Sequence, residues 1–170
     1  MSSPPLVAVV LGSANDIETI EPCLEQLRAL AVPYEVRVLS AHRTPDAAAA
    51  FARGAADAGL RVLIGAAGMA AHLAGTLAAS TPLPVIGVPL PSPLGGAEAL
   101  LSTVQMPGGV PVACVAVGKA GPVNAAILAA QILGVGDPAF RERIRALKEE
   151  LARDGLARDR EMREKHRWAP

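Results

Sequence analysis

Two histidines and an arginine lie in short segments that follow apolar runs of the chain. His42 and Arg43 belong to the segment Ser40-Ala41-His42-Arg43-Thr44-Pro45, and His72 follows the small residues 66–71. The planar guanidinium of Arg43 suits a phosphate dianion, and Ser40 with the amides of the following helix start could complete a phosphate site. Histidine titrates near neutral pH, so His42 and His72 could transfer protons.

A second polar segment, Gly12-Ser13-Ala14-Asn15-Asp16, places a hydroxyl and an acid before an expected helix. Backbone N–H groups at a helix N-terminus bind anions, and Ser13 could add a hydrogen bond to such a ligand. Asp16 could accept hydrogen bonds from ribose hydroxyls, or it could only cap its own helix.

His72 and Lys119 each allow two interpretations. His72 could be a core histidine, or it could face a ligand in the room that its small neighbours leave. Burial would then lower its pKa and keep a neutral imidazole available as a base. Lys119 could bind phosphate or only bond to nearby carbonyls. A Walker A loop is excluded because Ala113 and Ala120 stand where that motif needs Gly and Ser or Thr.

Short β-branched runs alternate with helical patterns along the chain. The runs predict strands at residues 6–11, 34–39, 62–65, 85–88 and 112–117. Helices are predicted at residues 17–30, 47–58, 70–79 and 123–133, with the Thr44 hydroxyl as the cap of the second. This alternation predicts a single α/β domain, a three-layer α/β/α sandwich with a parallel, flavodoxin- or Rossmann-like sheet. Ligands bind such sheets at the carboxyl ends of the strands, where the polar segments fall. Polar residues within run 34–39 place it nearer an edge.

Length and composition narrow the class of protein. The 170 residues suit one domain, 51% of them are hydrophobic, and the formal net charge is zero. Nucleic acid is not expected as a partner because no basic excess exists, and so apolar a chain is expected to hide surface in an oligomer. Cys23 and Cys114 match no metal spacing and are expected as free thiols in a reducing cytosol. Residues 1–5 lack a signal-peptide pattern, so a cytoplasmic location is expected.

Three other classes of protein fit the sequence poorly. The uncharged stretch 62–97 is interrupted by five prolines, whereas a membrane-spanning helix needs about 20 apolar residues, so no membrane association is expected. A response-regulator receiver needs an aspartate where Gly65 and Ala66 stand. A flavin-binding domain would need aromatic side chains around the ring, but aromatic residues make up 2% of the chain and none lies in the polar segments.

A charged C-terminal helix is predicted over residues 138–166. Its apolar residues form one stripe, Phe140, Ile144, Leu147 and Leu151. Such a stripe packs either on its own domain or on a neighbouring subunit, and the low net charge favours the neighbour. Trp168 could anchor the end of the chain, or the terminus could fray.

Several of these segments, in order along the chain, resemble the PurE family, the catalytic subunits of phosphoribosylaminoimidazole carboxylase. The motifs SAHRTP at residues 40–45 and VQMPGGVPV at residues 104–112 are the most specific. The resemblance runs from Val7 to the C-terminal helix. It implies a three-layer sandwich and a homo-octamer in which active sites lie between subunits and the last helix reaches a neighbour. It also implies that no metal, ATP or biotin is required.

The resemblance implies a reaction of de novo purine biosynthesis. One branch of the family is a mutase that converts N5-carboxyaminoimidazole ribonucleotide into 4-carboxy-5-aminoimidazole ribonucleotide by decarboxylation and recarboxylation. The other branch carboxylates aminoimidazole ribonucleotide directly with carbon dioxide. The segment Ala70-Ala71-His72-Leu73 is similar to the mutase branch.

Catalytic and binding roles follow from the same resemblance. His72, with His42 in the same site, is implied to protonate the departing N5 nitrogen and later to remove the C4 proton, or to act in the reverse order. The implied ribonucleotide-binding residues are Ser13, Asn15, Asp16, Ser40, Ala41, Arg43 and Gly68. Asp16 is expected on the ribose hydroxyls and Ser40 near the phosphate.

The chain departs from the family pattern in two loops. Ala66 stands where many members have Gly and is expected to narrow the pocket. The loop 91–100 is about one residue short, with Glu98 and Ala99 where Asp-Ser is usual, so its closure over substrate could differ.

Overall fold

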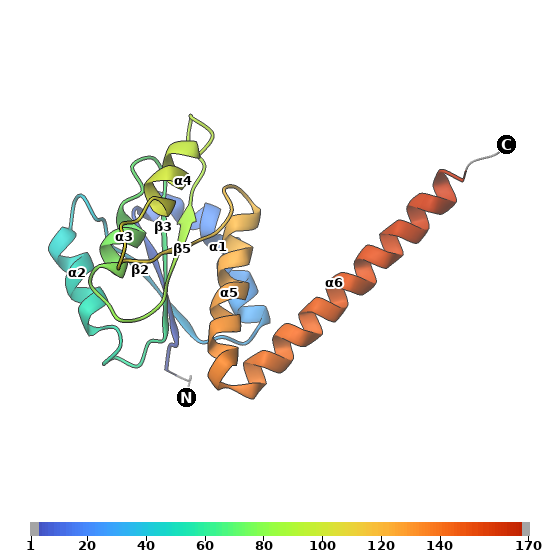
Figure 1. Ribbon diagram of the computed structural model, residues 1–170, viewed down its shortest axis with the longest axis horizontal. Coiled ribbons are helices and arrows are strands. Elements are labelled where there is room, and N and C mark those ends of the chain that lie inside the picture. Colours follow the sequence, from blue (N-terminus) through green and yellow to red (C-terminus); the bar gives the residue numbers. More distant parts are fainter. Residues whose placement is uncertain (1–3, 168–170) are drawn as a thin grey trace.

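The computed structural model describes residues 4–167 and contains a five-stranded sheet between two layers of helices (Figure 1). The strands are β1 (Val7–Leu11), β2 (Tyr34–Val38), β3 (Val62–Ala67), β4 (Val85–Pro89) and β5 (Ala113–Cys114). Their order is β2-β1-β3-β4-β5, and all neighbours are parallel. This confirms the predicted doubly wound α/β fold, and β2 lies at an edge as expected.

The helices alternate with these strands along the chain. They are the short 3-10 helix η1 (Ala14–Asp16), α1 (Ile17–Ala29), α2 (Pro45–Gly54), α3 (Leu73–Ala78), α4 (Ala97–Val104), α5 (Ala120–Gly136) and α6 (Pro138–Lys165). Asp137 caps α6 by accepting a 2.8 Å hydrogen bond from the Ala139 amide. The predicted cap by Thr44 is wrong: its hydroxyl makes no cap bond to α2 and is instead paired with the backbone of Ser40.

The alternating residues of the strands build two apolar cores, one on each face of the sheet. Val7, Val9 and Leu11 of β1 face the core formed with α1, α5 and the start of α6. Ala8 and Val10 face the core formed with α2 and α3. Both faces of β1 are therefore buried, which explains why its sequence is wholly apolar.

Helix α3 lies unusually close to the sheet. A Cβ on Gly65 of β3 would lie 3.0 Å from the Cα atom of Ala74, so a larger residue there would push α3 away from the sheet. The predicted helix 70–79 is shorter than expected because residues 68–72 form the loop that leads from β3 to α3. His72 consequently stands directly before the first turn of α3.

Two other elements differ from the prediction. Strand β5 keeps only two residues of the expected run 112–117. No helix was predicted at α4, because the prolines and glycines of residues 91–96 indicate a loop. In the described residues 4–167, no helix combines the length and the apolarity that crossing a membrane requires.

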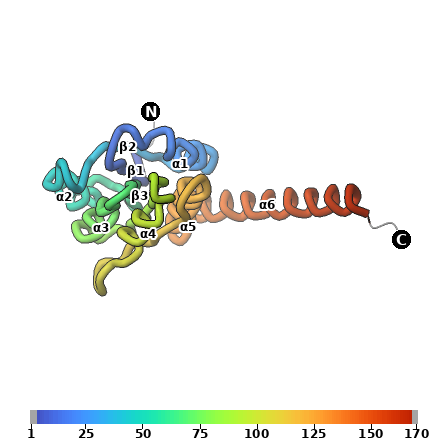
Figure 2. Tube along the Cα trace, turned by 90° about the horizontal axis from the view of Figure 1, so that it is seen from above, coloured from blue at the N-terminus to red at the C-terminus, as the bar shows by residue number. Residues whose placement is uncertain are grey.

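Helix α6 packs on its own domain only at its beginning. Phe140 is 6% exposed and Ile144 is 7% exposed, whereas Leu151 on the same stripe is 57% exposed. The rest of the helix extends away from the body (Figures 1 and 2). Trp168, considered as an anchor, lies outside the described residues.

Candidate active site

A cavity of about 560 Å³ lies at the carboxyl end of the sheet. The segments that follow β1, β2, β3 and β4 all contribute to its lining. Eight of the nine site residues expected from the sequence line it: Ser13, Asp16, Ser40, Ala41, His42, Arg43, Gly68 and His72. Parallel strands bring their carboxyl ends to one edge of the sheet, which is why segments far apart in sequence meet here.

Asn15 is the expected site residue that does not line the cavity. It is exposed, and its backbone amide donates a 3.3 Å hydrogen bond to the Ser13 hydroxyl. Its contribution in this arrangement is to hold Ser13 at the cavity rather than to reach the cavity itself.

The Ser40 hydroxyl organises the segment that carries Arg43. It accepts hydrogen bonds from the backbone amides of His42 and Arg43, at 3.3 Å and 3.2 Å. The Arg43 side chain lies across two loops, since its Nη2 donates to the Gly12 carbonyl at 2.7 Å and its Nε to the Ser40 hydroxyl at 3.4 Å. The guanidinium is therefore held beside Ser13, where a bound anion would meet both groups.

The carboxyl of Asp16 has a pKa raised from its ordinary value, mainly because partial burial disfavours the charged form. A backbone hydrogen bond at Ser13 and the positive charge of Arg43 oppose this shift. The side chain precedes α1 but makes no cap hydrogen bond to it. The interpretation of Asp16 as a simple helix cap is therefore not realised, and Asp16 lines the cavity.

His42 and His72 both line the cavity and contact each other. Nε2 of His42 lies 2.7 Å from Nδ1 of His72, and the two rings meet edge to face at an interplanar angle of 77°. One of these nitrogens must carry the hydrogen and the other must accept it, so the two rings form a hydrogen-bonded pair. His72 is exposed and lines the cavity, so of its two interpretations the structure excludes the core histidine.

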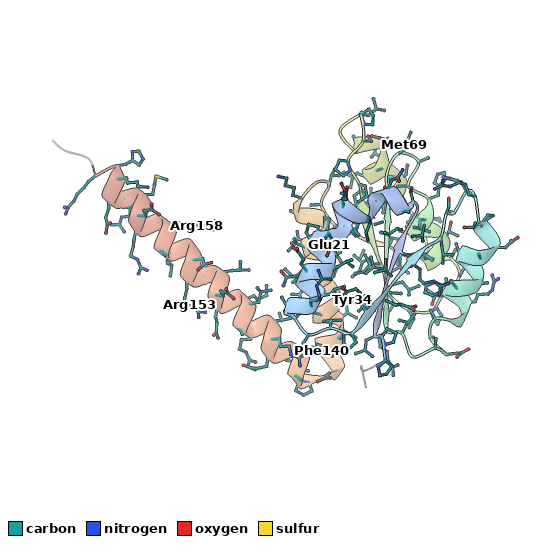
Figure 3. All side chains as sticks on the ribbon, turned by 180° about the vertical axis from the view of Figure 1, so that it is seen from behind. Glu21, Tyr34, Met69, Phe140, Arg153 and Arg158 are labelled. Carbon is teal, nitrogen blue, oxygen red and sulfur yellow. The ribbon has the colours of Figure 1, made fainter. Side chains whose placement is uncertain are left out.

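Several cavity residues lie in loops after strands, where ligand binding was expected, but were not singled out as site residues. Leu90, Pro91, Ser92 and Pro93, after β4, form one wall. Met69, after β3, also lines the cavity and stands out from the end of the body (Figure 3). Met69 has a φ of 56°, a conformation that is unfavourable for a side chain of its size. The position of these residues after strands was the available signal.

Ala66 does not narrow the pocket, contrary to expectation. Its side chain is fully buried in the core that contains α1 and α5, and the residues that reach the cavity from β3 begin at Ala67. Lys119 also lies outside the cavity lining, at the start of α5.

The cysteines lie away from the chemistry. Cys23 is a buried free thiol, and burial raises its pKa to about 12, so it stays protonated. Cys114 is free and partly buried. Among residues 4–167, no group of three or more His, Cys, Asp or Glu side chains is arranged to hold a metal ion.

Comparisons with known proteins identify the family of this chain. A family model described as AIR carboxylase matches residues 6–154. The chain is 51% identical over 159 residues to N5-carboxyaminoimidazole ribonucleotide mutase of Mycobacterium tuberculosis, covering 93% of this chain and 90% of that one. It is 55% identical over 134 residues to the Bacillus subtilis protein of the same name, covering 78% and 83%. The crystal structure of Treponema denticola PurE matches with a TM-score of 0.83 and 27% identity, covering 92% and 98%. The chain thus belongs to the AIR carboxylase family, the PurE family that its motifs resemble.

Proposed function

We propose that this protein is a mutase that converts N5-carboxyaminoimidazole ribonucleotide into 4-carboxy-5-aminoimidazole ribonucleotide in purine biosynthesis. The observation that carries the proposal is a hydrogen-bonded histidine pair in the same cavity as Arg43 and Asp16. Relatives about half identical to this chain over most of its length are named as this mutase. Their names favour the mutase over direct carboxylation of aminoimidazole ribonucleotide.

The ribonucleotide is proposed to bind along the loops after β1 and β2. Arg43, Ser40 and Ser13 surround one end of the cavity and offer the charged and neutral donors that a phosphate needs. Asp16 would accept hydrogen bonds from the ribose hydroxyls, and Ala41 and Gly68 would border the nucleotide. In this arrangement the aminoimidazole ring of the ribonucleotide would lie near His42 and His72.

The reaction requires one proton to be delivered and one to be removed. As the N5–carboxylate bond breaks, N5 takes a proton and carbon dioxide is released; C4 then attacks carbon dioxide and loses its own proton. The net proton change is zero. Holding carbon dioxide beside C4 replaces a bimolecular encounter, an effect worth up to about 7–11 kcal/mol.

The histidine pair suits this proton balance. When both rings are neutral, one ring donates the hydrogen bond between them, and its second (outer) nitrogen is free to accept a proton. The other ring accepts that hydrogen bond, and its outer nitrogen carries an N–H that can be donated. The pair thus offers one acid and one base. If the base accepts the C4 proton and the shared hydrogen crosses the bond, the pair is neutral again, with the donor and acceptor rings exchanged and no net proton gained or lost. His72 and His42 are both proposed as catalytic on this ground.

Assembly and location complete the proposal. We propose a homo-octamer with active sites between subunits, in which α6 packs on a neighbour, and a cytoplasmic location. Supporting this, α6 packs on its own domain through Phe140, Ile144 and Leu147 and carries exposed apolar residues beyond them. No cofactor is proposed.

An ATP-free assay of the purified protein tests the function. One reaction contains N5-carboxyaminoimidazole ribonucleotide, and another contains aminoimidazole ribonucleotide with low bicarbonate; both are followed for the 4-carboxy product. Rapid formation only in the first reaction is expected. Efficient formation only in the second would assign the protein to direct carboxylation, and no product in either would refute both activities.

Replacement of each histidine tests the proton transfer. His42→Asn and His72→Asn should each lower kcat by at least about 100-fold, the usual contribution of general acid–base catalysis, while nucleotide binding is retained. A variant with wild-type kcat would remove that histidine from the mechanism. The Lys119→Ala variant, outside the cavity lining, is the control and should keep its activity.

A further inference from the structure

The wall of the cavity that follows β4 is held by an internal hydrogen-bond cluster. Ser92 lines the cavity, and its hydroxyl oxygen accepts from the amides of Leu94 and Gly96, at 3.1 Å and 3.2 Å. The same hydroxyl donates its hydrogen to Oε1 of Glu98. Both lone pairs and the hydrogen of Ser92 are therefore used within the loop, so this hydroxyl shapes the wall rather than binding a ligand.

Glu98 approaches this cluster from the first turn of α4. A carboxylate is favoured at that position by the helix dipole. Its second oxygen, Oε2, is buried and has no hydrogen-bond partner among residues 4–167. A buried oxygen without a partner lowers folding stability, so a glutamate that serves only stability would be a poor choice here.

The loop between Ser92 and Glu98 has little freedom to rearrange while this cluster is intact. Gly96 has a φ of 79°, and a Cβ there would lie 2.6 Å from Val117 and 3.1 Å from the Leu90 carbonyl oxygen. The loop is thus packed against the strand end that it follows. The Gly95 amide also donates to the Ser92 carbonyl at 2.9 Å, and the contact from Ser92 to Glu98 is the side-chain link that ties the loop to α4.

We propose that Glu98 is a positioning residue that acts through Ser92 to keep the 91–96 wall closed over the released carbon dioxide. This inference rests on the proposed mutase function. Without the link, the wall opens more often, and carbon dioxide escapes before C4 captures it. The products of such an escape are aminoimidazole ribonucleotide, with N5 protonated by the histidine pair, and free carbon dioxide.

Isotope retention measures this escape directly. N5-carboxyaminoimidazole ribonucleotide labelled with carbon-13 in the carboxylate is converted in unlabelled bicarbonate, and mass spectrometry gives the labelled fraction of the 4-carboxy product. The formation of aminoimidazole ribonucleotide is measured in parallel and corrected for the reaction without enzyme. The variants are Glu98→Ala, Ser92→Ala and the double variant.

Each single variant should raise the ratio of escaped to retained label about fivefold, the effect expected of one lost hydrogen bond. The double variant should do little more, because both changes break the same link. Glu98→Gln keeps an acceptor for the Ser92 hydroxyl and should restore retention. Ser102→Ala, on the same helix, is the matched control and should behave as wild type.

The outcomes separate this inference from the function beneath it. If the wild-type protein forms labelled 4-carboxy product and the Glu98 and Ser92 variants retain label equally well, the positioning role is refuted while the mutase stands. If the wild-type protein forms no 4-carboxy product, both are refuted. A fall in melting temperature of Glu98→Ala without any change in label retention would mean that Glu98 is only structural.

Discussion

At the scale of single residues, the site is built from side chains that hold one another in place. The Ser40 hydroxyl fixes the backbone of the segment that bears His42 and Arg43, while the Gly12 carbonyl receives the arginine. A phosphate-binding guanidinium is most effective when it is ordered before the ligand arrives. Two predictions belong to this scale.

Replacing Arg43 by alanine should weaken ribonucleotide binding more than it slows the bound reaction. Loss of a charged hydrogen bond to phosphate costs about 1.5–3 kcal/mol, so the Kd of the 4-carboxy product should rise about 10- to 100-fold. Isothermal titration calorimetry measures this directly. An unchanged Kd would remove Arg43 from the phosphate site, and Arg43→Lys, which keeps the charge but loses the fork, should fall between the two.

Replacing Asp16 by asparagine should stabilise the free protein while weakening binding. The folded-state pKa of Asp16 is raised from 3.8, so the fold favours the protonated carboxyl. The stability gained from protonated Asp16 is present at low pH and is lost as the pH rises through the raised pKa. Asp16→Asn should therefore raise the melting temperature near pH 7 and have little effect near pH 3, where both side chains are neutral. A variant less stable than wild type near pH 7 would contradict the burial argument.

At the scale of elements, arginines at the start of α6 join three helices. Arg143 donates to the carbonyls of Leu30 and Ala31 at the end of α1, at 3.2 Å and 3.3 Å. Arg141 donates from Nε to the Gly134 carbonyl of α5 at 2.9 Å. Helix carboxyl ends leave carbonyls unpaired and carry partial negative charge, so cations stabilise them. These contacts fix where α6 leaves the domain.

Removing Arg143 should destabilise the fold. Arg143→Ala leaves two α1 carbonyls without their partner and removes a guanidinium that lies 5.0 Å from the Phe140 ring centre. We expect a loss of about 1–2 kcal/mol in the free energy of unfolding, measured by urea denaturation. Arg153→Ala, on the part of α6 away from the body, is the control and should stay within about 0.5 kcal/mol (Figure 3). Equal effects of both changes would refute the capping role.

At the scale of the whole molecule, the outer part of α6 carries apolar residues that its own domain does not cover. Leu151, Leu156 and Met162 are 57%, 62% and 58% exposed along its outer part. Together with zero net charge and a highly apolar composition, these residues favour assembly with other copies of the chain.

Polar substitutions on α6 should therefore lower the oligomeric state. Leu156→Ser combined with Met162→Ser should shift the protein from the proposed octamer toward smaller species, because the lost apolar area no longer favours association. Sedimentation velocity measures the mass, and Arg158→Ser, on the same helix, is the control. An unchanged octamer in the double variant would exclude this part of α6 from the interface.

The amino-acid sequence by itself determined the fold class and most of the site. Strands buried on both faces need continuous apolar residues, and strand ends need polar loops if a ligand binds there, so both leave local patterns. This is why the parallel sheet and the edge position of β2 were predictable, and why polar residues such as Ser13, His42 and Arg43 stood out. The cavity residues Ala41 and Gly68 were expected only from the resemblance to the PurE family.

Only the tertiary structure decided features that depend on distance between segments. Two contacts, of His42 with His72 and of Ser92 with Glu98, join residues whose spacing in sequence gives no sign of contact. The burial of Ala66 likewise depends on the helices that pack over it. Helix α4 was missed because the glycines and prolines before it indicate a loop, while packing of Ala99 and Thr103 on the sheet side stabilises the helix. Local propensity is weak compared with burial, so such elements are decided by the fold as a whole.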